Sequence, residues 1–211
     1  MDGNLKNLLK VDRAFFFVLL ISGTGCVSAG GVVSQGVGVT SPSPMPRTYR
    51  DSGWWVVDGL HVTGTPVTVD IASYRLAVSG NVRLPLSLSY DEIREMSWVR
   101  EQVTLVCPGV FVDKGVWTGV PLHDILRGAG LEIDSIRVAF ISMDERYRSE
   151  LPLEKALRDG FLIAYEFNGK TFDRRNGFPL RLVAKDEPGY YWMKWLGRIE
   201  VIAEMETSET K

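Results

Sequence analysis

Seven short apolar runs bounded by turn residues constrain the fold of this chain more than any other feature. They are rich in Val, Ile and Leu and too short for ordinary helices, so each predicts a strand. The expected strands are Tyr74–Val78, Leu84–Leu88, Val103–Val106, Ile136–Ile141, Phe161–Phe167, Leu180–Ala184 and Ile199–Ala203. Because strands and helices do not alternate regularly, a doubly wound parallel sheet is not expected.

Three brief helical patterns lie between these runs. The first opens with Ser89 and Glu92, which form a capping-box signature, and the second places an apolar face between a first-turn proline and a terminal glycine. The pair Asn168-Gly169 predicts a hairpin turn. The expected helices run from Ser89 to Met96, Pro121 to Ala129 and Pro152 to Arg158. The expected class is therefore α+β, with mixed sheets and short helices.

The N-terminal segment is typical of an export signal. Ala14 to Ile21 is an apolar run of signal-peptide length, and Cys26 follows a stretch of small residues as the modified cysteine of a prokaryotic lipoprotein does. An ordinary signal peptide or an uncleaved anchor is the alternative. We expect a leader over residues 1–25, a Gly/Ser/Pro-rich tether over 26–50, a folded domain over 51–205 and a polar tail over 206–211. The predicted location is membrane-anchored on the extracytoplasmic side.

Composition excludes several classes of function. The net charge is -2, and no basic stripe with interleaved aromatics is present, so nucleic-acid binding is not expected. His61 and His123 lie far apart in the sequence, without other ligands at zinc spacing, so a zinc site is not expected. A disulfide between Cys26 and Cys107 would tie the tether to the folded domain, and we do not expect it. Pattern alone thus leaves Cys107 as an isolated thiol at the end of a strand.

Three sequence blocks carry a more specific signal. The first is Val103-Thr-Leu-Val-Cys-Pro-Gly109 with Trp117-Thr-Gly-Val-Pro-Leu122. The second is Leu151-Pro-Leu-Glu-Lys-Ala-Leu157, which runs into Leu162-Ile-Ala-Tyr-Glu-Phe-Asn-Gly169. The third is Asn176-Gly-Phe-Pro-Leu-Arg-Leu-Val183, followed by Gly189-Tyr-Tyr-Trp-Met-Lys-Trp-Leu-Gly-Arg-Ile-Glu200. In order and spacing, these blocks resemble the oxidoreductase molybdopterin-binding domain of sulfite oxidases and their small prokaryotic relatives.

The resemblance covers about Tyr74 to Ala203 and implies a molybdenum–molybdopterin cofactor, with tungsten as the alternative metal. Cys107 matches the metal-ligating cysteine of the family, and a soft thiolate suits a metal already bound by dithiolene sulfurs. The resemblance further implies contacts to the pterin from Asn176, Arg181, Trp192, Met193 and Lys194. The acidic pterin contact is assigned to Glu145, with Asp144 as the alternative.

Three departures from the family pattern limit the expected substrate. Sulfite-oxidising members carry an arginine five residues after the cysteine, where this chain has Val112, and a histidine where it has Asn176. The Arg/His-containing pterin segment of the family is also not evident around Trp54 to Asp58. We therefore expect a small-molecule substrate other than sulfite.

The expected function is an exported two-electron oxidoreductase that transfers oxygen atoms. It would pass electrons to a separate partner such as a haem protein, because no haem or iron–sulfur ligand set is recognisable. Membrane attachment would come from the N-terminal lipid or anchor. The alternatives are an envelope lipoprotein that keeps this fold as a non-catalytic binding or structural module, and an exported domain that binds another anion in the same pocket.

Overall fold

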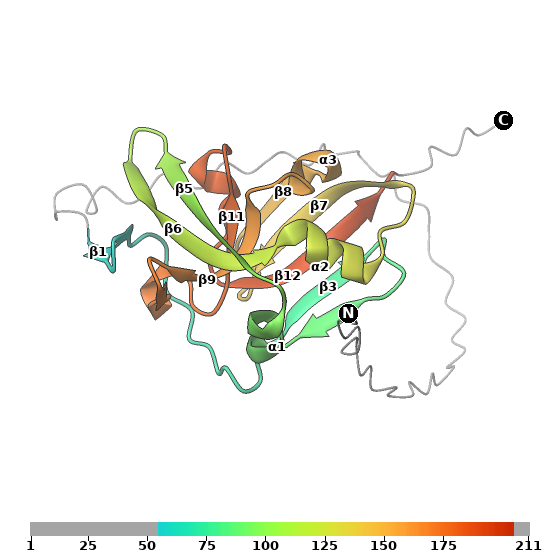
Figure 1. The fold of residues 1–211 in the computed structure, drawn as a ribbon, viewed down its shortest axis with the longest axis horizontal. Helices are drawn as coiled ribbons and strands as arrows, with labels where there is room; N and C mark the ends of the chain where they lie inside the picture. The colour runs from blue at the N-terminus through green and yellow to red at the C-terminus, as the bar shows by residue number, and fades with distance from the viewer. Residues whose placement is uncertain (1–54, 205–211) are drawn as a thin grey trace, which may run out of the picture. The chain divides into compact units, whose positions relative to one another are not determined.

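The computed structural model describes residues 55–204, which form two five-stranded sheets and a short separate hairpin (Figure 1). The strands are β1 (Val56–Val57), β2 (Leu60–His61), β3 (Leu76–Gly80), β4 (Leu86–Leu88), β5 (Val99–Cys107), β6 (Phe111–Pro121), β7 (Ser135–Ser142), β8 (Arg148–Pro152), β9 (Phe161–Phe167), β10 (Lys170–Thr171), β11 (Arg181–Ala184) and β12 (Leu196–Ala203). The helices are α1 (Tyr90–Glu95), α2 (Leu122–Ala129) and α3 (Leu153–Ala156), with 3-10 turns η2 (Arg174–Asn176) and η3 (Gly189–Tyr191).

The two sheets differ in their pairing. One has the order β10-β9-β6-β5, with β11 also paired to β9, and all of its pairs are antiparallel. The other has the order β4-β3-β12-β7-β8, in which β12 runs parallel to β3 and antiparallel to β7. This arrangement confirms the predicted α+β class with mixed sheets. The buried apolar residues of the two sheets and of α2 form one core cluster.

Local sequence rules account for several element boundaries. Ser89 and Glu92 make both hydrogen bonds of the capping box at the start of α1. Gly130 ends α2 in the left-handed conformation, and Asn168 and Gly169 both adopt positive φ in the turn between β9 and β10. These three predictions are confirmed.

Four strands have no counterpart among the predicted runs and hairpin. The short strands β1 and β2 were not expected, the β6 strand occupies the stretch after Cys107, and β8 occupies a polar stretch before α3. The third helix is also shorter than predicted, since α3 ends at Ala156. The predicted N-terminal leader and tether, including Cys26, and the C-terminal tail lie outside the described residues.

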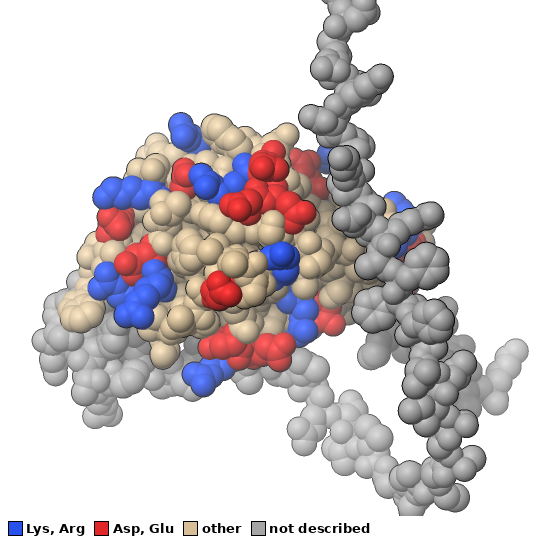
Figure 2. All heavy atoms as spheres, turned by 90° about the horizontal axis from the view of Figure 1, so that it is seen from below, with Lys and Arg blue, Asp and Glu red and all other residues tan. Residues whose placement is uncertain are grey.

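The described surface has no single dominant charge on the face shown in Figure 2. Basic and acidic side chains are interspersed there, as the small net charge of the chain would suggest. Among residues 55–204, no helix is long and apolar enough to cross a membrane.

Alanine substitutions at two glycines should change the stability of this fold in opposite directions. A Cβ at Gly119, in β6, would lie 2.4 Å from the backbone oxygen of Ile163 in β9, whereas a Cβ at Gly128, in α2, would meet nothing within 4 Å. We expect Gly119→Ala to lower the free energy of unfolding by about 1–3 kcal/mol through overpacking. Gly128→Ala should raise it by roughly 0.5–1 kcal/mol through helix propensity.

Urea unfolding followed by circular dichroism measures both changes. A Gly119→Ala variant as stable as the parent chain would show that β6 and β9 do not approach as closely as described.

Candidate cofactor site

The β5–β6 hairpin positions the predicted metal ligand, Cys107. The two strands pair antiparallel, with Cys107 opposite Phe111, and the connecting turn is closed by a 3.0 Å hydrogen bond from the Val110 amide to the Cys107 carbonyl oxygen. Side chains alternate along a strand. Val103 and Leu105 are buried, so Cys107 shares their inner face and lies half-buried where the hairpin leaves the core.

The second wall around Cys107 is the turn η3. A Cβ at Gly189 would lie 3.1 Å from the carbonyl oxygen of Val106 and 3.3 Å from the Cα of Cys107. Glycine therefore suits this close approach. Gly189 and Cys107, which are far apart in the sequence, meet here, and the backbone of η3 packs against the Cα and Cβ of Cys107.

Two basic side chains lie inside the domain near this point. Arg181 is only 2% exposed, donates a 3.0 Å hydrogen bond from Nη1 to the carbonyl oxygen of Asn176, and stacks over the Trp117 ring at 5.0 Å. Burial lowers the pKa of Arg181 to about 10. Its Nε has no hydrogen-bond partner among the described residues.

Lys194 is the second of these cations. Its Nζ donates to the carbonyl oxygen of Thr63 at 2.9 Å and reaches that of Arg175 at 3.5 Å. Burial of the ammonium group, followed by the positive charge of Arg181, holds the pKa of Lys194 well below its ordinary value. An added negative charge at this point would oppose both effects.

Asp113 supplies a negative charge within the site, and sequence analysis missed it. Its carboxylate is buried and accepts hydrogen bonds from the backbone amide of His61, at 3.0 Å, and from the Nδ1 position of the same residue. The Asp113 charge raises the pKa values of Cys107, Arg181 and Lys194, so it lies within electrostatic reach of all three. Once β6 is recognised as a strand, the alternation of its side chains indicates that Asp113 faces inward, opposite Leu105.

Asn176 lies in the η2 turn, between this charged cluster and the N-terminal hairpin. It is 1% exposed, and its Nδ2 donates a 2.8 Å hydrogen bond to the carbonyl oxygen of Val57, while its Oδ1 has no partner among the described residues. Gly177 follows at φ +104°, and a Cβ there would lie 3.0 Å from both the Cγ of Arg181 and the Cβ of Lys194. The glycine therefore lets three predicted cofactor residues pack together.

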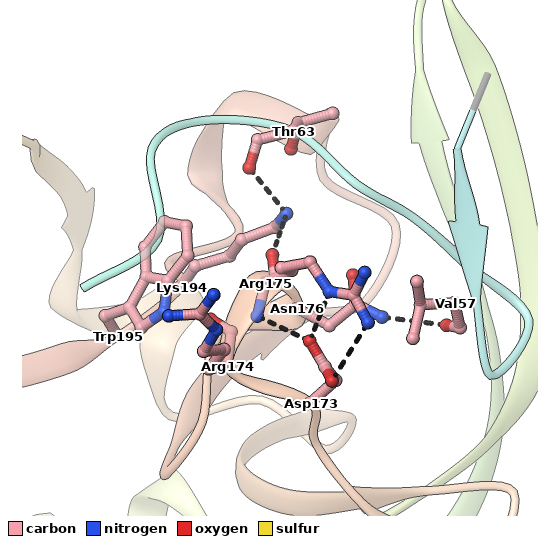
Figure 3. A network of polar contacts seen from close by, with 8 residues as sticks. All are labelled: Val57, Thr63, Asp173, Arg174, Arg175, Asn176, Lys194 and Trp195. Carbon is pink, nitrogen blue, oxygen red and sulfur yellow. Dashed lines mark hydrogen bonds and ion pairs between the residues drawn. The ribbon is translucent and has the colours of Figure 1, made fainter. Parts of the chain in front are cut away.

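Figure 3 shows how the segment from Val57 to Thr63 is held against η2 and Lys194. Asn176 bonds Val57 at one end, Lys194 bonds Thr63 at the other, and Trp195 Nε1 donates to the carbonyl oxygen of Arg174 at 2.7 Å. The segment from Val57 to Thr63 thus contacts the predicted cofactor residues through its backbone, although it lacks the Arg/His pattern of the family.

The remaining predicted residues are arranged around the same centre. Trp192 is buried, donates from Nε1 to the carbonyl oxygen of Glu187 at 3.1 Å and meets the Trp117 ring edge-on at 5.3 Å. The carbonyl oxygen of Met193 accepts from the Leu182 amide at 2.9 Å.

The two acidic candidates have different surroundings. Asp144 accepts a 2.7 Å hydrogen bond from the Ser142 hydroxyl and so braces its own turn. Glu145 has positive φ, lies 3.6 Å from Nη1 of Arg198 and lines a groove of about 520 Å³ with Met143 and Gly197. The assignment of either residue to the pterin stays a prediction.

Val112, where sulfite-oxidising members carry arginine, lies in β6 rather than in a loop. It is 50% exposed and pairs with Val106, so both side chains lie on the outer face of the hairpin, opposite to Cys107.

The residues present fit an anionic cofactor with sulfur ligands. Two cations and one carboxylate share a buried region in which Arg181 Nε and Asn176 Oδ1 lack partners. Buried polar groups without partners are costly unless a ligand or water satisfies them. In the described part of the chain, no three His, Cys, Asp or Glu side chains gather to hold a metal, so a metal at Cys107 would need further ligands from a cofactor.

Comparison with known proteins identifies the class. Residues 62–210 match the family model of the oxidoreductase molybdopterin binding domain, and the chain belongs to this family. It is 30% identical to mouse mitochondrial sulfite oxidase over 176 residues, which are 77% of this chain and 31% of that protein. It is also 30% identical to the Bacillus subtilis oxidoreductase YuiH over 148 residues, which are 69% of this chain and 73% of the relative.

The fold has a solved counterpart. The sulfane dehydrogenase SoxCD from Paracoccus pantotrophus matches with a TM-score of 0.61 and 22% identity, over 66% of this chain and 40% of that one. The family and the fold class predicted from the sequence are thus confirmed. The chain spans less than half the length of the sulfite oxidases from mouse and Arabidopsis thaliana that it matches.

The surroundings of Cys107 predict its reactivity in the cofactor-free protein. Burial, and then the negative charge of Asp113, raise the pKa of the Cys107 thiol above its ordinary value. Only the thiolate reacts with iodoacetamide, so the alkylation rate should reach half its maximum above the ordinary cysteine pKa of about 8.5. Asp113→Asn should move this midpoint to lower pH.

Peptide mapping by mass spectrometry separates Cys107 from Cys26 in this measurement. A midpoint at or below that of a model thiol, or an Asp113→Asn midpoint unchanged from wild type, would contradict the described environment.

Proposed function

We propose that this chain is a molybdopterin-dependent oxidoreductase that binds a molybdenum–molybdopterin cofactor and transfers oxygen atoms in two-electron steps. The observation that carries the proposal is a pair of cations, the buried Arg181 and the half-buried Lys194, which lie within reach of the Asp113 charge, as the Cys107 thiol does, in a domain of the molybdopterin-binding family. When bound, the metal supplies the two-electron redox chemistry, and the protein supplies orientation and electrostatics.

Each residue has a distinct role in this proposal. Cys107 would provide the thiolate ligand, since molybdenum with dithiolene sulfurs accepts soft ligands. Arg181, Lys194 and Asn176 would bind the anionic and polar parts of the pterin, and Trp192, Met193 and Glu145 are the further contacts that the resemblance implies. Arginine offers a planar set of donors, whereas lysine acts as a point charge.

The substrate in this proposal is a small molecule other than sulfite. Relatives named sulfite oxidases match the chain over less than half of their own length, and Val112 replaces the arginine expected to hold an anionic substrate. Electrons would pass to a separate partner such as a haem protein. The N-terminal pattern around Cys26 supports export and a lipid anchor as further parts of the proposal.

A non-catalytic module with the same fold is the second candidate. It is favoured by Val112 and by Asn176, which occupy positions where sulfite-oxidising members carry arginine and histidine. Such a module would need no metal, so metal binding separates the two functions.

Metal analysis tests the proposal. The full chain, made in a host that synthesises molybdopterin, should carry molybdenum at close to one atom per chain. Cys107→Ser should lose most of it, because a hydroxyl is a harder and weaker ligand than a thiolate. Cys26→Ser is the matched control and should retain the metal. A wild-type chain without molybdenum or tungsten, or a Cys107→Ser variant that keeps full occupancy, would overturn the assignment.

The substitution Arg181→Met tests whether the Arg181 charge serves cofactor binding or the stability of the fold. A buried charge contributes little to stability, so Arg181→Met should leave the free energy of unfolding of the cofactor-free chain within about 1 kcal/mol of wild type or raise it. The same change should weaken cofactor retention by about tenfold or more, because it removes charge-assisted hydrogen bonds.

Urea unfolding and the rate of pterin release during dialysis measure these two effects. A variant that unfolds easily but keeps its cofactor would show that Arg181 serves the fold instead.

A further inference from the structure

Tyr147 lies at the end of a turn that is rigidly braced. The Ser142 hydroxyl accepts from the Tyr147 amide at 3.1 Å and donates to Asp144 at 2.7 Å, while the Ser142 amide donates to the Tyr147 carbonyl oxygen at 3.0 Å. These bonds close the loop between β7 and β8. The backbone that carries the Tyr147 ring is therefore fixed to the edge of the second sheet.

The Tyr147 side chain reaches from this turn to the other wall of the site. Its ring is half-buried against the core cluster, and its hydroxyl donates a hydrogen bond to the carbonyl oxygen of Tyr190, in η3. The thiol of Cys107 is close enough for its charge to raise the pKa of Tyr147, after the larger effect of burial. The hydroxyl thus bonds Tyr190, the residue that follows Gly189, and Gly189 packs on Cys107.

The η3 segment has few other side-chain anchors among the described residues. Trp192 Nε1 bonds the carbonyl oxygen of Glu187, and Lys155 bonds the Glu187 carboxylate at 2.7 Å, both on the upstream side of Gly189. On the downstream side, a side-chain hydrogen bond to the η3 backbone comes from Tyr147. Loss of this bond would loosen the η3 backbone next to Gly189, the residue that packs on Cys107.

We propose that Tyr147 is a positioning residue for Cys107, because its hydroxyl holds η3, which packs against the Cα and Cβ of Cys107, and so fixes the orientation of the thiol and its access to solvent. The role of Cys107 as metal ligand rests on the proposed function, but the clamp itself does not. In the loaded protein the clamp would keep competing thiol reagents and water from the ligand. In the cofactor-free protein it would limit access to the same sulfur.

The test compares two tyrosines with matched chemistry. Tyr147→Phe removes the hydroxyl that bonds η3, and Tyr74→Phe removes a buried hydroxyl that donates to the carbonyl oxygen of Leu196 at 2.6 Å. Each variant loses one hydrogen bond from a tyrosine to the backbone, and each keeps its ring. Alkylation of Cys107 by iodoacetamide is followed at fixed pH by peptide mapping of the full chain.

Tyr147→Phe should increase the alkylation rate of Cys107 by about fivefold, the change expected for one hydrogen bond in an opening equilibrium. Tyr74→Phe should leave the rate within about twofold of wild type, whatever its effect on unfolding. In cofactor-loaded protein, Tyr147→Phe should also speed metal loss to a chelator relative to Tyr74→Phe.

Equal alkylation rates in wild type and Tyr147→Phe, or equal increases in both variants, would overturn the clamp. Failure of the metal-loss arm alone, with a fivefold change in alkylation, would instead contradict the proposed metal site.

Discussion

The burial of two cations with a single neighbouring carboxylate is the constraint on which the site depends. Arg181 lies in β11 and is buried, and Lys194 lies two residues before β12 and is half-buried. A buried charge is expensive unless it is paired and hydrogen-bonded. Asp113 is the carboxylate whose charge reaches both cations, and its two oxygens also accept hydrogen bonds from His61.

The hydrogen-bond donors of the site need acceptors, which explains why backbone carbonyl oxygens from several segments lie around them. Backbone carbonyl oxygens of Val57, Thr63 and Asn176 accept the hydrogen bonds that the buried donors can make within the protein. Two buried atoms, Arg181 Nε and Asn176 Oδ1, have no hydrogen-bond partner among the described residues. An anionic pterin cofactor would supply the missing acceptor and donor groups, and its phosphate would balance the charge. The fold and the cofactor thus depend on the same residues.

Sequence patterns predicted much of this fold because many of its determinants are local. The capping box at Ser89, the stop at Gly130 and the turn at Asn168-Gly169 depend on neighbours within a few residues. The β6 strand escaped prediction because Gly115 and Gly119 weaken its strand pattern. Both are there because other strands come too close for a side chain: a Cβ at Gly115 would clash with Phe167, and one at Gly119 with Ile163. The β8 strand is polar because it lies at a sheet edge.

Only the site residues that lie in the sequence blocks shared with the family could be predicted. Cys107, Arg181, Asn176 and Lys194 were found through sequence blocks, and the structure brings the last three together around Gly177. The Asp113–His61 pair joins residues separated by 52 positions, and the bond from Tyr147 to η3 spans 43, so no local pattern could indicate either. Such contacts depend on the register of paired strands, which composition and periodicity do not determine.

Native mass spectrometry of the full chain, purified gently from a host that makes molybdopterin, tests the central claim most directly. If Arg181 and Lys194 bind an anionic metal–pterin cofactor, the mass of the folded chain should exceed that of the polypeptide by the mass of one such cofactor, and denaturation should release it. A bare polypeptide mass, or a bound ligand of another mass, would contradict this account of the site.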